Sequence, residues 1–221
     1  FSHNRLEVDE DLDVAARGTW RADADSLLEY PFPVGPFTLT PFAGLRYTWY
    51  EEDLFERRNE DRFGFTHGAT LAMQAWRVWD VSGGLFDLDG LRHVVYPEIT
   101  FRNTIGVELE PDELVQYDPV DAFDDVQVVE LRARNLLQTV RQRDTGPAIE
   151  NIVDLDARTA YFPNAGRDHG GDPWSDLELD LIVRFSDALQ MAADAELDWY
   201  GKGLEVANYA VGYVPSRAFQ A

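Results

Sequence analysis

The chain has no cysteine and only two methionines among its 221 residues. Without cysteine it can build neither a disulfide framework nor a thiolate metal site. Positive charge is also scarce, because 19 Lys and Arg residues stand against 41 Asp and Glu residues, for a formal net charge of −22. A surface of that sign repels phosphate backbones, so we expect no nucleic-acid partner.

Long hydrophobic runs are missing as well. No stretch approaches 18 consecutive apolar residues, so the sequence contains no candidate for a transmembrane helix. A membrane β-barrel remains possible, because each crossing needs only about 9–11 residues of alternating character. The mean hydropathy of −0.34 fits such a wall as well as it fits a soluble protein. The chain begins at Phe1 with no signal-peptide pattern, which we interpret as an internal segment of a longer protein.

The most prominent pattern is an alternation of apolar and polar residues with few interruptions. It is clearest in residues 177–185 and 189–199, which are separated by a short break at 186–188. A period of two is the β-strand period, because successive side chains leave a pleated backbone on opposite faces. These two runs therefore predict a hairpin with one aliphatic face and one charged face.

Similar runs recur along most of the chain. They predict further strands at 38–49, 63–75, 94–104, 126–142, 153–161 and 204–214, with a bulge near Ala207 where the parity changes. A weaker candidate at 19–29 is stopped by Pro31 and Pro33. We expect about eight to nine strands, almost no helix, and one continuous antiparallel up-and-down meander. Residues 1–221 are interpreted as a single all-β segment of a larger transmembrane outer-membrane β-barrel.

Two features favour a barrel wall over a soluble sandwich. Aromatic residues gather at the ends of the runs, among them Trp49, Tyr161 and Trp199, as in the girdles of transmembrane barrels. A wall about 25 Å tall takes roughly ten residues of tilted strand, whereas sandwich strands more often have about 5–6. The runs 177–185 and 189–199 match the wall length.

The two faces of the predicted strands assign the candidate site residues. Carboxylates at i, i+2 spacing could form a glycosidase pair or a metal cage, but a solvated lumen lining is the favoured interpretation. The predicted lumen-lining residues are Arg46, Asp154, Asp156, Arg158, Glu178, Asp180, Arg184, Asp194, Glu196 and Asp198. The predicted lipid-facing residues are Leu177, Leu179, Leu181, Val183, Leu189, Met191 and Leu197.

No motif of catalysis or metal binding stands out. Asp168, His169 and Asp172 are interpreted as an acidic loop, although they could bind a divalent cation. The four histidines are scattered, and the nucleophile elbow, the phosphate-binding loop and the dinucleotide-binding glycine pattern are all missing. We therefore predict no enzyme activity, no catalytic residue, no metal site and no cofactor.

Several short segments bear a family resemblance. The segment Leu91-Arg92-His93-Val94-Val95-Tyr96-Pro97-Glu98 resembles the "L-R-H-x-x-x-P" barrel strand of the outer-membrane lipopolysaccharide-assembly protein family LptD (OstA). Tyr30-Pro31-Phe32 through Arg46 resembles a strand entry of that family, and Leu131-Arg132-Ala133-Arg134-Asn135-Leu136-Leu137-Gln138-Thr139 resembles its "l-x-N-x-l-q-t" strand. Asp154-Leu155, Tyr161-Phe162-Pro163 and Tyr213-Val214-Pro215-Ser216 fit the strands that follow.

The resemblance implies a role rather than a catalytic site. Members of that family form a large barrel in the outer membrane of Gram-negative cells, with a separate periplasmic domain and an LptE plug lipoprotein. They receive lipopolysaccharide from periplasmic bridge proteins and release it laterally into the outer leaflet. The resemblance therefore implies lipopolysaccharide, an LptE-like plug, the bridge proteins and outer-membrane lipids as partners. The periplasmic domain, the family's cysteines and a closing aromatic strand are absent here, so we expect the lateral gate to lie outside this segment.

Two alternatives remain open at this stage. One is another outer-membrane barrel, a porin or general transporter. The other, from a different class, is a soluble β-sandwich that binds carbohydrate.

Overall fold

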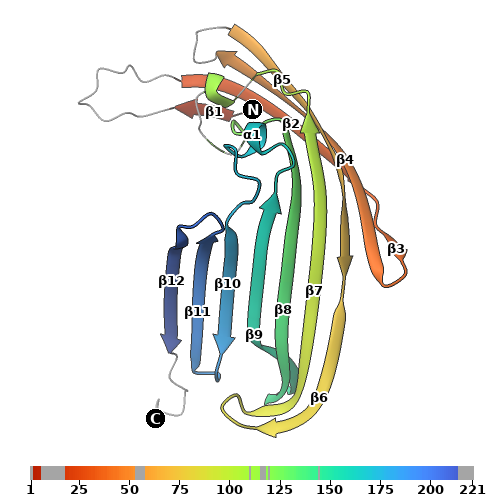
Figure 1. Ribbon diagram of the computed structural model, residues 1–221, viewed down its shortest axis with the longest axis vertical. Helices are drawn as coiled ribbons and strands as arrows, with labels where there is room; N and C mark the ends of the chain where they lie inside the picture. The colour runs from red at the N-terminus through yellow and green to blue at the C-terminus, as the bar shows by residue number, and fades with distance from the viewer. Residues whose placement is uncertain are drawn as a thin grey trace, which may run out of the picture. The chain divides into compact units, whose positions relative to one another are not determined.

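The computed structural model describes residues 2–5, 18–52, 58–109, 111–114, 118, 120–143 and 145–213. Twelve β-strands account for most of this described part (Figure 1). They are β1 (Ser2–Arg5), β2 (Gly18–Glu29), β3 (Phe32–Val34), β4 (Phe37–Glu52), β5 (Arg58–Met73), β6 (Ala75–Gly83), β7 (Leu88–Ile105), β8 (Val126–Arg143), β9 (Gly146–Tyr161), β10 (Leu177–Arg184), β11 (Leu189–Asp198) and β12 (Gly203–Tyr213).

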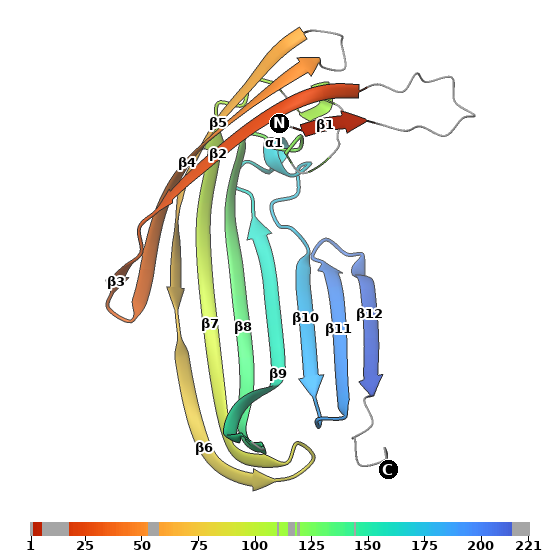
Figure 2. The ribbon, with the colours of Figure 1, turned by 180° about the vertical axis from the view of Figure 1, so that it is seen from behind.

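The strands form an antiparallel up-and-down sheet, as the alternating sequence predicted. The order along the sheet is β1-β2-β4-β5-β7-β8-β9-β10-β11-β12, while β3 pairs with β4 and β6 pairs with β7. Within the described residues, β1 and β12 are the two ends of this order, so the sheet is not closed there. Figure 1 and Figure 2 show β10, β11 and β12 side by side, joined by short turns.

The hairpin predicted from the alternation at residues 177–185 and 189–199 is confirmed. Leu177 pairs with Leu197 and Arg184 with Gln190, so β10 and β11 are in register along eight residue pairs. Phe185 and Ser186 donate their backbone N–H groups to the carbonyl of Leu189 and close the turn between the two strands. The weaker candidate at 19–29 is also a strand, β2.

The strand count exceeds the expected eight to nine for two reasons. Two long strands are broken: β2 and β3 are separated at Tyr30-Pro31, and β5 and β6 at Gln74. Proline lacks the backbone N–H that a ladder needs, which explains the first break. The remaining additional strand is β1, which the alternation did not predict.

Two β-bulges change which residues of β12 and β9 lie on each face of the sheet. The β11–β12 register shifts between Glu196, which pairs with Val206, and Leu197, which pairs with Leu204. The extra residue is Glu205, two positions from the expected bulge at Ala207. The β8–β9 register shifts between Leu137 and Gln138, which leaves Ile152 of β9 as the extra residue. An inserted residue reverses the face of every side chain beyond it, so each bulge limits how far one face continues.

The chain divides into two compact units. Unit 1 comprises residues 1–31, 40–69 and 101–127, and unit 2 comprises residues 32–39, 70–100 and 128–221. The strands β4, β5, β7 and β8 contribute residues to both units.

Helical structure is minor in the described residues. It consists of a 3₁₀ turn at Pro111–Glu113 and one four-residue α-helix, α1, at Ala165–Asp168. None of the described helical segments is long and apolar enough to cross a bilayer.

Candidate functional site

The main candidate site is a charged face in unit 2, built by β8, β9, β10 and β11. The register places Arg134, Asp156, Asp180, Asp194 and Asn208 in one row across five strands, and Arg132, Arg158, Glu178 and Glu196 in the next row. Side chains directly opposite one another on neighbouring strands lie on the same face. These two rows bring together five of the predicted lumen-lining carboxylates with Arg158, and a sixth, Asp154, lies two residues from Asp156 on the same face of β9.

Arginines of β8 and β9 connect the carboxylates of this face. Arg134 donates to Asp154, with Nε 2.9 Å from Oδ1 and Nη2 2.6 Å from Oδ2. Arg132 donates to Asp156 in the same two-pronged manner. Arg158 lies between Glu178 and Asp180, with Nε 3.0 Å from the Glu178 Oε2 and Nη2 bonded to Asp180. We use the name ionic ladder for these three arginines together with the carboxylates that share their face, which are Asp154, Asp156, Glu178, Asp180, Asp194 and Glu196.

The ionic ladder has more negative than positive groups. Three guanidinium groups, from Arg132, Arg134 and Arg158, face six carboxylates: Asp154, Asp156, Glu178, Asp180, Asp194 and Glu196. Carboxylates sit directly opposite each other at Asp156–Asp180 and Asp180–Asp194, an arrangement that destabilises a sheet unless it is compensated. Part of the compensation comes from Asn208, whose Nδ2 donates to the Asp194 Oδ2 at 2.7 Å.

A shallow hollow of about 320 Å³ opens on the same face. Glu98, Glu130, Arg132, Arg158, Ser175 and Glu178 contribute to its lining. About half of the side-chain surface of Arg158 and Asp180 is exposed, so the groups are solvated and not enclosed. Such an open row of paired charges can hydrogen-bond hydroxyl, phosphate or amino groups that pass along it, and it does not form a closed reaction chamber.

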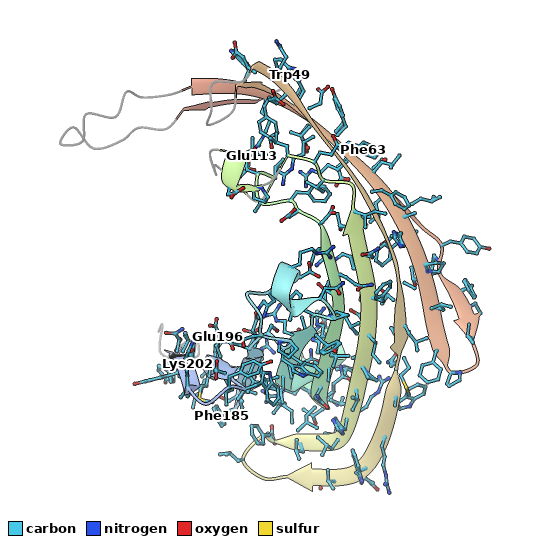
Figure 3. The ribbon with its side chains drawn as sticks, turned by 45° about the horizontal axis from the view of Figure 1, so that its top comes forward. Trp49, Phe63, Glu113, Phe185, Glu196 and Lys202 are labelled. Carbon is cyan, nitrogen blue, oxygen red and sulfur yellow. The ribbon has the colours of Figure 1, made fainter. Side chains whose placement is uncertain are left out.

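Three of the predicted lumen-lining residues are not members of the ladder. Arg184, at the end of β10, donates to the Asn151 carbonyl at 3.2 Å. Asp198, at the end of β11, accepts the backbone N–H groups of Tyr200 and Lys202 and shapes the following turn. Figure 3 labels Lys202, which belongs to this turn, and Phe185, which begins the turn that joins β10 to β11. Arg46 belongs to unit 1.

The opposite face of the same strands is apolar. Its β10 and β11 members are the seven predicted lipid-facing residues, Leu177, Leu179, Leu181, Val183, Leu189, Met191 and Leu197, together with Ala193 and Ala195. On β12 the face continues with Ala207, Tyr209, Val211 and Tyr213. Val183 is buried, Leu189 is exposed and the other five predicted residues are half-buried. The β12 residues are the most open, with Tyr209 83% exposed.

Unit 1 contains a second group of charges, and these are buried. Arg21 of β2 is 5% exposed, Arg62 of β5 is 1% exposed, and Asp121 has no exposed surface. Arg21 donates to Asp121 at 2.7 Å, and the Tyr50 hydroxyl donates to the same carboxylate oxygen at 3.0 Å. Arg62 donates from Nη1 to the Asp121 carbonyl at 2.9 Å.

The segment between β7 and β8 supplies the cover over these groups. Asp118 and Asp121 both come from it, and so does Phe123, whose ring lies 5.4 Å from the Arg46 guanidinium and 5.7 Å from that of Arg62. Gly64 of β5 leaves room for this ring, because a Cβ there would stand 2.2 Å from Cε1 of Phe123. The residue predicted to line a lumen, Arg46, is thus bonded to Asp23 and overlaid by Phe123. The sequence gave no sign that this segment folds back.

In unit 1 the polar face of the strands is buried and the apolar face is exposed, which is the reverse of the pattern in a soluble sandwich. Along β4 the polar-parity residues Thr48 and Tyr50 are 2% and 3% exposed, whereas Leu45 and Tyr47 are 48% and 44% exposed. Along β5 the buried Arg62 precedes Phe63, which is 49% exposed. Figure 3 shows Trp49 and Phe63 on the side of these strands away from the turn that carries Glu113.

Sequence reasoning missed a pair of polar contacts between β7 and β8. His93 Nε2 lies 3.3 Å from the Asn135 Oδ1. The buried Thr139 hydroxyl accepts the Asp89 N–H at 2.9 Å and donates to the Gly90 carbonyl at 2.8 Å. His93, Asn135 and Thr139 all come from segments that carry the family resemblance, and their polar character at apolar-parity positions was the available signal. The closing segment of that resemblance, beyond Tyr213, lies outside the described residues.

The acidic loop after β9 is held by internal contacts. Arg167 is bonded to Asp168, and His169 Nδ1 lies 2.8 Å from the Asp172 carbonyl. The His169 ring stacks on Phe162 at a centroid distance of 4.3 Å. At the same end of β9, Tyr161 contacts Trp174, whose backbone N–H donates to the Tyr200 hydroxyl. The predicted aromatic cluster at this strand end therefore exists as a set of mutual contacts.

Neither the protein-family models nor the curated proteins include a match to the chain.

Proposed function

We propose that this chain is a section of the wall and lumen of an outer-membrane β-barrel that inserts lipopolysaccharide into the outer leaflet. The architecture supports this, because an up-and-down antiparallel sheet in which ten of the twelve described strands have eight to eighteen residues suits a barrel wall. The lipopolysaccharide assignment rests on the sequence resemblance to the LptD family. It brings with it the outer membrane of Gram-negative cells as location and an LptE-like plug and periplasmic bridge proteins as partners.

The observation that carries the proposal is the reversed burial in unit 1. A soluble sandwich hides its apolar face and exposes its polar one. Here Arg21, Arg62 and Asp121 are buried, while Leu45, Tyr47 and Phe63 lie in the open. Exposed apolar surface of this extent requires an apolar environment, and lipid provides it. The same observation disfavours the carbohydrate-binding sandwich.

The ionic ladder supplies a polar path within unit 2. In the proposed function it faces the lumen and accepts the sugar and phosphate part of the lipid, while the acyl chains stay in apolar surroundings. Because the ladder has three more carboxylates than guanidinium groups, anionic head groups need divalent cations or the nearby arginines to pass.

A pair of neighbouring substitutions tests the wall. Leu181→Arg places a charge on the apolar face and should block membrane insertion, at a cost of about 2–4 kcal/mol near the midplane. Asp180→Asn changes the charged face and should be nearly silent for insertion. Insertion is measured as detergent-dependent extraction and heat-modifiable gel migration of the full-length protein. A monomeric product that folds cooperatively without detergent would overturn the barrel.

Photo-crosslinking tests the lipopolysaccharide path. A photoreactive residue in place of Asp180 should capture lipopolysaccharide in cells, and the same residue in place of Leu181 should capture phospholipid instead. Efficient insertion with no lipopolysaccharide adduct from any position of the ionic ladder would favour a porin or general transporter.

A further inference from the structure

Two arginines of the β6–β7 hairpin have no carboxylate partner among the described residues. Arg77 of β6 lies over the ring of Trp79, with Cζ 5.4 Å from the ring centroid. Arg92 of β7 lies over Trp76 in the same way, at 5.7 Å. In a chain with 41 acidic and 19 basic residues, several other described arginines pair with carboxylates, and Arg62 and Arg184 bond to backbone carbonyls. Among those that pair with carboxylates are Arg21, Arg46, Arg132, Arg134, Arg141 and Arg158.

The two arginines occupy opposite faces of the hairpin. Arg77 pairs in register with His93, and Arg92 pairs with Val78. Because paired residues share a face and successive residues alternate, Arg77 lies with His93, and Arg92 lies with Trp76 and Val78 on the other side.

Arg77 begins a polar row that crosses three strands of the apolar face. It is next to His93, whose Nε2 lies 3.3 Å from Oδ1 of Asn135 on β8. Trp79 stacks on His93 at a centroid distance of 6.4 Å. The residues of the same parity around this row are apolar: Ala75, Leu91, Val95, Ala133 and Leu137.

A guanidinium on an apolar face needs an anion, because water is replaced there by surroundings that do not solvate the charge. The described part of the chain supplies none to Arg77. Arg presents several N–H donors that match phosphate oxygens, and the Trp79 indole N–H and the Asn135 amide add neutral donors nearby. Trp and Arg together are also the residues that meet lipid head groups at a membrane interface.

We propose that Arg77, Trp79, His93 and Asn135 form a binding site for the phosphate of an anionic membrane phospholipid on the lipid-facing side of the wall. The flanking apolar residues receive the acyl chains of that lipid. This site rests on the proposed barrel, and it concerns a resident bilayer lipid, not the transported one.

The test measures lipid selectivity of the full-length protein in phosphatidylcholine vesicles that contain a minor fraction of phosphatidylglycerol. Spin-labelled lipids report the fraction of each class that the protein immobilises. The unchanged protein should prefer phosphatidylglycerol over phosphatidylcholine by about fivefold, the ratio expected for one cation at the surface. Arg77→Gln should bring this ratio below about twofold, and Asn135→Leu should lower it less.

Arg92→Gln is the matched control, because it removes the same kind of charge from a tryptophan on the opposite face. It should leave the selectivity unchanged. Inorganic phosphate added to the vesicles should also leave it unchanged, whereas a loss of selectivity would mean that the site takes free phosphate and not a lipid head group.

The outcomes separate this site from the barrel itself. A protein that inserts into the vesicles with no preference, or that loses its preference equally in Arg77→Gln and Arg92→Gln, overturns the head-group site and leaves the barrel standing. A protein that fails to insert at all overturns both.

Discussion

Arg21 and Asp121 form a buried ion pair between residues 100 positions apart, with Nη1 2.7 Å from Oδ1. Asp121 has no exposed surface, and the Tyr50 hydroxyl binds the same oxygen. With Arg62 and Asp118 nearby, two guanidinium groups and two carboxylates balance each other. The pair therefore fastens the segment after β7 onto the polar face of unit 1, where a lumen would lie.

Asp121→Asn should release that segment. The substitution leaves Arg21 and Arg62 buried with half of their compensating charge, and breaking a buried pair in this way costs about 3–5 kcal/mol. Hydrogen exchange should show loss of protection at Asp121 and Phe123 while the β10–β11 hairpin stays protected. Asp112→Asn, an exposed position in the 3₁₀ turn, is the control and should change nothing. Unchanged protection in Asp121→Asn would contradict the fastening role.

Acidification should weaken the Arg21–Asp118 contact that helps to hold the segment after β7. The Arg21 guanidinium holds the pKa of the Asp118 carboxyl below its ordinary value of 3.8. A carboxyl with a lowered folded-state pKa stabilises the protein fully above its unfolded value, and the contribution is lost as the pH falls through the folded value. The difference in unfolding free energy between the unchanged protein and Asp118→Asn should be about 1 kcal/mol or less at pH 6, since Asp118 is partly exposed.

That difference should begin to shrink below about pH 3.8 and vanish at still lower pH. Denaturant titrations of both proteins across this range measure it. A difference that grows on acidification would have the wrong sign and would exclude the proposed contact.

Gly64→Ala should disturb the fit of Phe123. The new methyl group would stand 2.2 Å from Cε1 of the ring, so the ring must move, at a cost of about 1–3 kcal/mol. Thermal unfolding in detergent should show the loss, and adding Phe123→Ala should recover part of it. Gly166→Ala, where a Cβ meets open space, is the matched control. A strictly additive double variant would mean that Gly64 and Phe123 do not interact.

Arg158→Gln should weaken the ionic ladder modestly and in a salt-dependent way. It removes the cation between Glu178 and Asp180, but the side chain is about half exposed, so the expected loss is about 0.5–1 kcal/mol. The remaining carboxylates should make unfolding more sensitive to divalent cations than in the unchanged protein. Titration of the unfolding midpoint with Mg²⁺ compares the two, and an identical dependence would argue against the ladder as a charged unit.

The alternation at 177–199 predicted its two strands, their turn and their two faces without reference to the rest of the chain. This worked because the strand period is a local property, written in residues that are neighbours in sequence. The same logic located the bulge in β12 only to within two residues, because the alternation changes parity visibly only after the extra residue, Glu205. The break at Gln74 left no trace in the alternation.

The alternation within each strand could not predict which residues of neighbouring strands pair. The partners of Arg132, Arg134 and Arg158 depend on register, and the alternation alone does not say which carboxylate of the next strand stands opposite. The meeting of His93 with Asn135 likewise needed β7 and β8 to lie side by side.

Composition and alternation were sufficient for the all-β antiparallel up-and-down class, for most of the strand positions and for the division into a charged and an apolar face. The folding back of the segment after β7 came from tertiary structure, because Arg21, Arg62 and Asp121 lie far apart in sequence and only their joint burial makes the attachment favourable. Local preference describes each strand by itself. Which charges are covered, and which leucines and tyrosines are left in the open, follows from long-range contacts that balance the burial of each ion against its partner.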